Sequence, residues 1–198
     1  MARPQTVTDE EILAAAHRVI TRRGYDSFAL SDVAAEVGLS RAAIILRFKS
    51  THDLRSALTH KMNMRYISEL NAQEVERSGD GLLSLCAFIA GAIASVDNYA
   101  GYLVIFRVNI TETALAEVER ERTEALRAAI AVRMPATVLS KQASVLAFEA
   151  MLQGAVMQWA SLQEVSLREH LLQRAKDWLT LAGIETKRLQ SKRVAASR

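Results

Sequence analysis

Residues 8–49 carry three short helical patterns with only a few residues between one pattern and the next. The patterns cover Thr8–Gly24, Ser31–Gly38 and Ser40–Phe48. Two helices joined by such a tight turn are a common way to place a short helix in the DNA major groove. The segment therefore predicts a compact helical domain and a role in binding nucleic acid.

Polar residues and glycine set the expected limits of these helices. Thr8 and Glu11 have the spacing of a capping box, in which each side chain accepts from the backbone N–H of the other. Ser31 and Ser40 are the expected N-caps of the second and third helices. Gly38 supplies the positive φ that a sharp turn between them requires.

The third pattern has an apolar face and an exposed face. Ile44 and Phe48, four residues apart, are expected to point inward, which leaves the intervening arginines and apolar residues for a partner. The residues expected to contact DNA are Ser31, Ser40, Arg41, Ala42, Ile45, Leu46, Arg47, Lys49 and Ser50. The alternative is a three-helix packing unit with an ordinary charged surface, but exposed Ile45 and Leu46 would then lack a partner.

This segment resembles the tetracycline-repressor (TetR) family of bacterial regulators. The resemblance rests on Ile12–Ala16, Gly24–Phe28, Ser31–Ser40 and Arg47–Leu54. It implies a homodimeric repressor that binds a roughly palindromic operator on double-stranded DNA and releases it when a small molecule enters the C-terminal domain.

Three positions depart from the family pattern. Ile45 replaces a tyrosine that commonly binds phosphate, Thr51 replaces a lysine, and Ala43 replaces a small hydroxyl residue. Either Arg47, Lys49 and their neighbours Ser50 and Arg55 take over the phosphate contacts, or the affinity is modest.

Helix-forming residues dominate the rest of the chain, so the fold class is predicted to be all-α with about nine helices. The expected division is a DNA-binding domain at 1–50, an effector-binding and dimerisation domain at 51–185, and a basic, disordered tail at 186–198. A fourth helix is expected to follow residue 50 and to end near Arg77. Further helices are expected at Leu82–Val96, Tyr99–Val108, Thr111–Met134, Ala136–Leu162 and Leu167–Ala182.

The net charge of +3 is unevenly distributed. Residues 1–65 carry +3, residues 66–185 carry −5, and residues 186–198 carry +5. Positive charge therefore lies at the two ends, where attraction to phosphate would use it, and the acidic middle would repel DNA.

Aromatic, methionine and amide residues in the second half predict a pocket for a small, largely apolar effector. The expected lining residues are Met62, Tyr66, Phe88, Tyr102, Phe106, Asn109, Met151 and Gln158. Each could equally be an ordinary core residue. Apolar stripes on the last two helices predict a dimer interface across a two-fold axis. Its expected residues are Val145, Leu152, Trp159, Leu171 and Trp178.

Other classes of protein fit the sequence less well. The single cysteine, Cys86, excludes an internal disulfide and fits a reducing cytoplasm. The apolar stretch 81–106 is long enough to span a membrane, but Asp97 and two glycines interrupt it. No catalytic, cofactor or metal-binding motif is found, so an enzyme is not expected. The remaining rival is a constitutive or architectural DNA-binding protein without a ligand.

Overall fold

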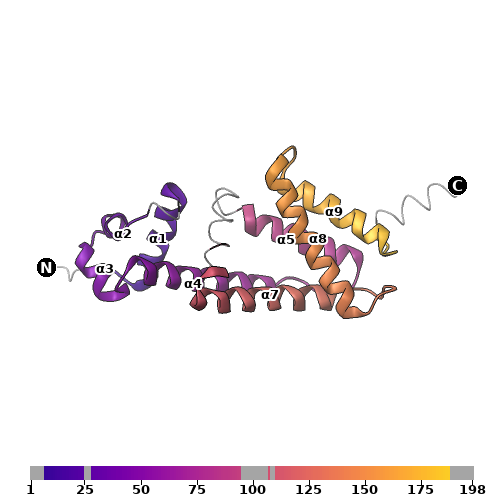
Figure 1. Cartoon of the computed structure of the whole chain (residues 1–198), viewed down its shortest axis with the longest axis horizontal. Coiled ribbons are helices and arrows are strands. Elements are labelled where there is room, and N and C mark those ends of the chain that lie inside the picture. The colour runs from indigo at the N-terminus through magenta and orange to yellow at the C-terminus, as the bar shows by residue number, and fades with distance from the viewer. Residues whose placement is uncertain (1–6, 25–27, 95–106, 108–109, 188–198) are drawn as a thin grey trace. The chain divides into compact units, whose positions relative to one another are not determined.

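The computed structural model describes residues 7–24, 28–94, 107 and 110–187. Within these residues the chain forms eight α-helices and no strand, which confirms the predicted all-α class (Figure 1). Their bounds are α1 Asp9–Arg23, α2 Leu30–Val37, α3 Arg41–Phe48, α4 Thr51–Asn71, α5 Gly79–Ala94, α7 Thr113–Arg133, α8 Lys141–Leu162 and α9 Leu167–Leu181. The helix expected at Tyr99–Val108 lies, apart from Arg107, outside the described residues.

The described residues divide into two compact units. The first unit contains residues 7–65 together with 107 and 110–120, and the second contains residues 66–94 and 121–187. Helices α4 and α7 each contribute turns to both units.

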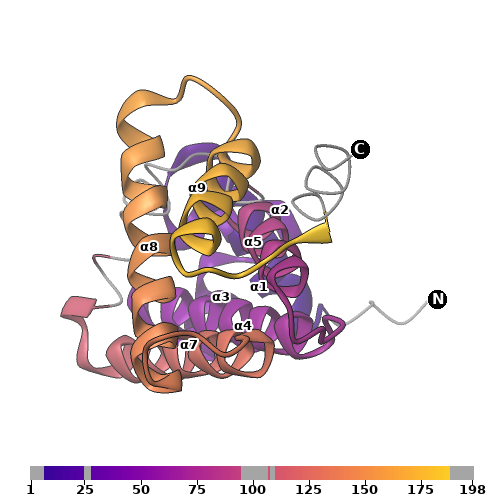
Figure 2. The ribbon, with the colours of Figure 1, turned by 90° about the vertical axis from the view of Figure 1, so that its right-hand side faces the viewer.

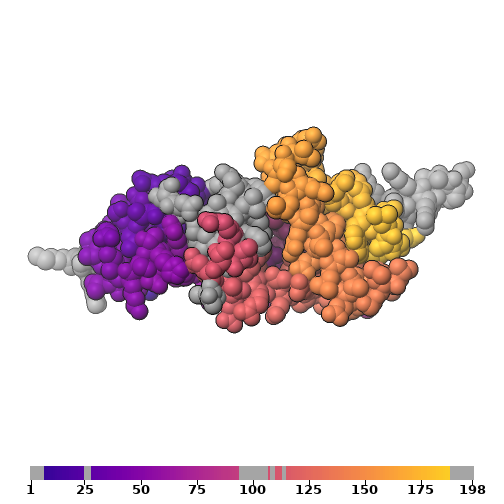
Figure 3. All heavy atoms as spheres, viewed as in Figure 1, coloured from indigo at the N-terminus to yellow at the C-terminus, as the bar shows by residue number. Residues whose placement is uncertain are grey.

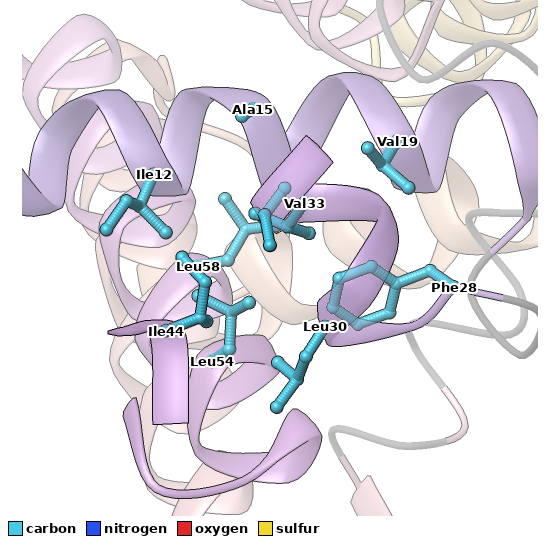
Figure 4. Close-up of a cluster of buried hydrophobic side chains, with 11 residues drawn as sticks. Ile12, Ala15, Val19, Phe28, Leu30, Val33, Ile44, Leu54 and Leu58 are labelled. Carbon is cyan, nitrogen blue, oxygen red and sulfur yellow. The ribbon is translucent and has the colours of Figure 1, made fainter. Parts of the chain in front are cut away.

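The first unit is built around one apolar cluster from α1 to α4. Ile12 and Ile44 are fully buried in it, and Figure 4 shows the side chains of the four helices converging. Leu54 and Leu58 of α4 belong to the same cluster, so the core of the first unit includes the helix that begins after residue 50. The buried members are Ile12, Ala15, Ala16, Val19, Phe28, Leu30, Val33, Ala34, Ile44, Leu54 and Leu58.

Charged pairs join α1 to α2 outside this core. Arg18 Nε donates to Glu36 Oε1 at 2.9 Å, and Arg22 bonds the same carboxylate. The hydrogen bond from Arg22 and that from Arg18 lower the pKa of Glu36 to about 2. Arg23 pairs with Asp32 at 2.9 Å. These ion pairs therefore hold the end of α1 against α2.

In the second unit, α9 packs against both α5 and α8 (Figure 2). Phe148 of α8 is fully buried and meets Trp178 of α9 edge-on, with ring centroids 5.0 Å apart. Cys86 on α5 is also fully buried, and desolvation raises the pKa of its thiol to about 12. It is therefore an inert packing residue.

The connection between α4 and α5 differs from the expected one. Helix α4 ends at Asn71 rather than near Arg77, and the chain turns through residues 72–78. The buried guanidinium of Arg133 organises this turn, because its Nη2 donates to the carbonyl oxygens of Gln73 at 3.2 Å and Glu74 at 2.7 Å. No periodicity in the sequence predicts these hydrogen bonds from Arg133.

Helix α5 begins with two glycines, Gly79 and Gly81, in its first turn. Ser78 caps the helix by accepting from Gly81 N at 3.0 Å. A Cβ on Gly81 would lie only 1.9 Å from the carbonyl oxygen of Glu76. Gly81 is therefore required by the close approach of the preceding turn.

Two further boundaries were predicted imperfectly. Helix α8 begins at Lys141 rather than Ala136, because Ser140 caps it by accepting from Ala143 N at 3.2 Å. At the other end of the unit, Thr186 is buried and Lys187 N donates to Asp80 Oδ2 at 3.0 Å. The disorder expected from residue 186 therefore does not apply to these two residues, and residues 188–198 lie outside the described range.

Candidate nucleic-acid interface

The orientation of α3 is fixed by the side that it buries. Ile44 is completely covered, while Leu39 and Phe48 pack partly against the same cluster. The opposite side is consequently open to solvent, as predicted from the spacing of the apolar residues. Ala42 and Leu46 lie on this exposed side, and Arg41 in the first turn of α3 is exposed as well.

The start of α3 is set by two local features. Gly38 ends α2 with φ +68° and ψ +27°, the left-handed conformation that glycine adopts at little cost. Ser40 then caps α3, its Oγ accepting from Ala43 N at 3.1 Å. Both agree with the sequence-based expectation. Because its hydroxyl serves the cap, Ser40 positions α3.

Ser31 has a different place from the one expected. It lies inside the first turn of α2, which begins at Leu30, and its side chain is exposed. The N-cap position belongs to Ala29, whose N–H donates to Asp32 Oδ2 at 3.1 Å. The prediction that Ser31 is the N-cap was therefore wrong, because Asp32 satisfies the helix start instead.

The two apolar residues expected at the DNA groove lie in different environments. Ile45 is half-buried and packs against the core of the first unit. Leu46 is 86% exposed, and Ala42, one helical turn before it, is also exposed. The open surface of α3 therefore has an apolar middle formed by Ala42 and Leu46.

Arg47 already has partners within the chain. Its Nη2 lies 2.5 Å from Asp9 Oδ1, and its Nη1 donates to the carbonyl oxygen of Val7 at 2.6 Å. These bonds attach the end of α3 to the start of α1. Arg47 thus holds α3 in place in addition to carrying a charge that could reach phosphate.

The link between α3 and α4 is a single tight turn at Lys49. The carbonyl oxygen of Phe48 accepts from Ser50 N at 2.6 Å, and Lys49 between them has φ +59° and ψ −52°. These angles and the bond over two residues define a γ-turn with positive φ, a rare and strained form. Ser50 then caps α4, because its Oγ accepts from Asp53 N at 3.0 Å. The Lys49 side chain is exposed.

Of the eight residues expected to line an effector pocket, the structure describes five. Met62 packs against the core of the first unit. In the second unit, Tyr66 and Phe88 stack with ring centroids 5.8 Å apart, and the guanidinium of Arg122 lies 5.8 Å from the Tyr66 ring. Tyr102, Phe106 and Asn109 lie outside the described residues.

Met151 and Gln158 line a separate, open hollow on α8 and α9, of about 300 Å³. These two helices adjoin each other on the face that Figure 3 shows in orange and yellow. The other residues around the hollow are Gly154, Ala155, Arg174, Asp177, Trp178 and Leu181.

Most residues expected at a dimer interface are covered by their own chain. Val145, Leu152 and Leu171 are buried, and Trp159 and Trp178 are half-buried. The stripes that suggested an interface instead pack α8 and α9 within the unit, because burial inside one chain produces the same periodicity. The apolar residues that these two helices leave exposed are Leu146, Met157, Leu162 and Leu181.

The described part of the chain has no candidate membrane span and no cluster of metal ligands. None of its helices has the length and hydropathy that crossing a membrane requires. Nor do three or more histidine, cysteine, aspartate or glutamate side chains gather there as a metal site.

Residues 12–58 match the sequence model of the family described as "Bacterial regulatory proteins, tetR family". No curated protein sequence matches this chain significantly. Several solved structures have the same fold at low sequence identity. A TetR transcription regulator from Haloarcula marismortui is 18% identical, covers 89% of this chain and 98% of its own, and superposes with a TM-score of 0.74.

Two further similar structures contain small molecules. A putative transcriptional regulator from Saccharomonospora viridis, in complex with choline, is 16% identical with a TM-score of 0.66, and covers 90% of this chain and 98% of its own. The multidrug binding protein EbrR, complexed with proflavin, is 22% identical with a TM-score of 0.59, and covers 85% and 98%. These likenesses show that the chain has the fold of TetR-type regulators over most of its length.

Proposed function

The N-terminal domain belongs to the TetR family of bacterial regulatory proteins, and from that premise we propose that the chain is a ligand-responsive transcriptional repressor. Regulators of this family bind DNA and are not enzymes. The observation that carries the proposal is the exposed surface of α3, where Arg41 and Leu46 are open to solvent while Ile44 anchors the helix to the core. The proposed target is a palindromic operator, with α3 in the major groove.

Electrophoretic shifts with a selected operator and with scrambled DNA test the DNA-binding role. Arg41→Ala is expected to cost about 1–3 kcal/mol on the operator and less on scrambled DNA, because arginine can bond guanine O6 and N7. Lys49→Ala is expected to weaken both complexes equally, since a phosphate contact carries no sequence information. Equal losses for both variants on both DNAs would contradict these roles.

The dimer is proposed to form through the exposed sides of α8 and α9. Met157 and Leu181 are 54% and 89% exposed there, beside the hollow described above. Two copies related by a two-fold axis would bring their α3 helices to successive major grooves, about 34 Å apart. Sedimentation equilibrium should show that Leu181→Glu dissociates the dimer. Leu139→Glu, at an exposed leucine between α7 and α8, is the matched control. A monomeric wild-type protein would contradict the proposal.

The effector is proposed to be small and largely apolar. The described residues that support a site are the stacked rings of Tyr66 and Phe88 with the guanidinium of Arg122 above Tyr66. Tyr66 lies on α4, the helix whose first turns carry Leu54 and Leu58 into the DNA-binding core. A ligand that moves α4 could therefore alter the position of α3. The choline and proflavin complexes of proteins with the same fold agree with small-molecule binding.

Thermal shift across a panel of metabolites and drugs tests this part of the proposal. A stabilising ligand that favours the DNA-free state by about 3 kcal/mol would weaken operator binding about 150-fold. A ligand that binds without changing operator affinity would contradict release. If operator binding is tight and the panel contains no stabilising ligand, the constitutive DNA-binding protein is the better description.

A further inference from the structure

The exposed side of α3 has the dimensions and charge pattern of a major-groove reader. Arg41 and Lys49 are both exposed and are separated by eight residues. The eight residues of α3, at about 1.5 Å per residue, form a helix about 12 Å long, short enough to lie within the major groove. Arg41 at the start of the helix can therefore meet a guanine edge and Lys49 just past its end can meet a phosphate, while the residues between them face the middle of the groove.

The middle of that side has no polar group long enough to read a base. Arg47 is turned toward α1 by its bonds to Asp9 and Val7, and Ile45 packs against the core. Leu46, which is 86% exposed, is thus the large side chain that extends from the middle of the helix. Ala42, exposed one turn earlier, leaves room beside it.

An exposed leucine can gain energy in the major groove only by covering an apolar group. The 5-methyl group of thymine is the apolar group among the base edges there, whereas guanine, cytosine and adenine present donors and acceptors. Leucine placed over those polar edges would leave them without partners, which is unfavourable.

We propose that Leu46, with Ala42 beside it, selects thymine in each half of the operator by contact with the 5-methyl group. The inference rests on the proposed DNA-binding function and adds the base that the middle of α3 recognises. Removal of one buried methyl is worth about 0.8 kcal/mol, or about 4-fold in affinity. Two equivalent contacts in a palindrome give about 15-fold.

The test replaces thymine by deoxyuridine, which removes the methyl and leaves base pairing unchanged. A duplex is first selected from a random pool with the full-length protein. Each thymine of one half-site, with its symmetry mate, is then replaced in turn, and affinity is measured for wild type, Leu46→Ala and Leu139→Ala. Because Leu46 is exposed, its truncation should leave the fold intact, which circular dichroism can verify.

We expect one replacement to weaken binding of wild type and of Leu139→Ala by about 15-fold, and to leave Leu46→Ala unaffected. Tight binding with no effect of any replacement would overturn the role of Leu46 and leave the DNA-binding function standing. If Leu46→Ala loses as much affinity as wild type on the same replacement, the role of Leu46 is overturned in the same way and the DNA-binding function still stands. Failure to select any duplex would refute the DNA-binding function itself, and the thymine contact with it.

Discussion

Lys49 offers a sharp test of the geometry that joins α3 to α4. Its φ of +59° puts a Cβ in a region that side chains avoid, at a cost of about 1–2 kcal/mol. Glycine removes this cost but has more freedom in the unfolded chain, which offsets about 0.5–1 kcal/mol. Taking the midpoints, Lys49→Gly should therefore be more stable than Lys49→Ala by about 0.8 kcal/mol, while both variants lose the same charge.

Urea denaturation followed by circular dichroism, at one fixed protein concentration, measures this difference. The matched pair is Arg120→Gly and Arg120→Ala, at an exposed position inside helix α7 of the same unit. There glycine should be less stable than alanine by about 1 kcal/mol, because its backbone loses more entropy in a helix. The two sites should thus give opposite signs. If glycine is less stable than alanine at Lys49 as well, the turn is not strained.

Three further predictions concern stability. Gly81→Ala should lower the free energy of unfolding by about 1–3 kcal/mol in urea denaturation, because its Cβ would lie 1.9 Å from a carbonyl oxygen. Gly91→Ala, whose Cβ would meet nothing within 4 Å, should not destabilise the protein. Ile44→Ala should cost about 2–5 kcal/mol by the same assay, since the side chain is completely buried; a smaller loss would contradict its central place. The pKa of Glu36 is about 2, below its value in the unfolded chain, so the stability that its ion pairs contribute is complete above pH 4.5 and is lost as the pH falls toward 2. Acid titrations of the unfolding midpoint should show a shallower loss in this window for Glu36→Gln, and parallel curves would contradict the contribution of these ion pairs.

Local signals in the first unit were strong enough to be read from the sequence. The Thr8 cap, the turn at Gly38 and the inward face at Ile44 depend on residues within a few positions of one another. Each was predicted because its cause is local. Ser31 was misplaced because the carboxylate of Asp32 accepts from Ala29 N, so that the helix begins at Leu30 and Ser31 lies inside its first turn.

Contacts between distant residues could not be read in the same way. The bond from Arg133 to the turn after α4 joins positions about sixty residues apart, and no periodicity marks it. The stripes on α8 and α9 were visible, but burial within a chain and burial between chains produce the same pattern. Val145 and Leu171 were therefore assigned to an interface although their own chain covers them.

The pairing of Arg47 with Asp9 affects how complex formation should respond to ionic strength. A free arginine that meets a phosphate releases about one counterion from the duplex, which contributes about 0.9 to the slope of log affinity against log salt. At Arg47 the phosphate must displace a carboxylate 2.5 Å away, so much of the electrostatic gain is an exchange of one anion for another. Asp9→Asn would leave this guanidinium without its internal counter-charge, and the measured slope should then steepen toward the value for one more neutralised phosphate.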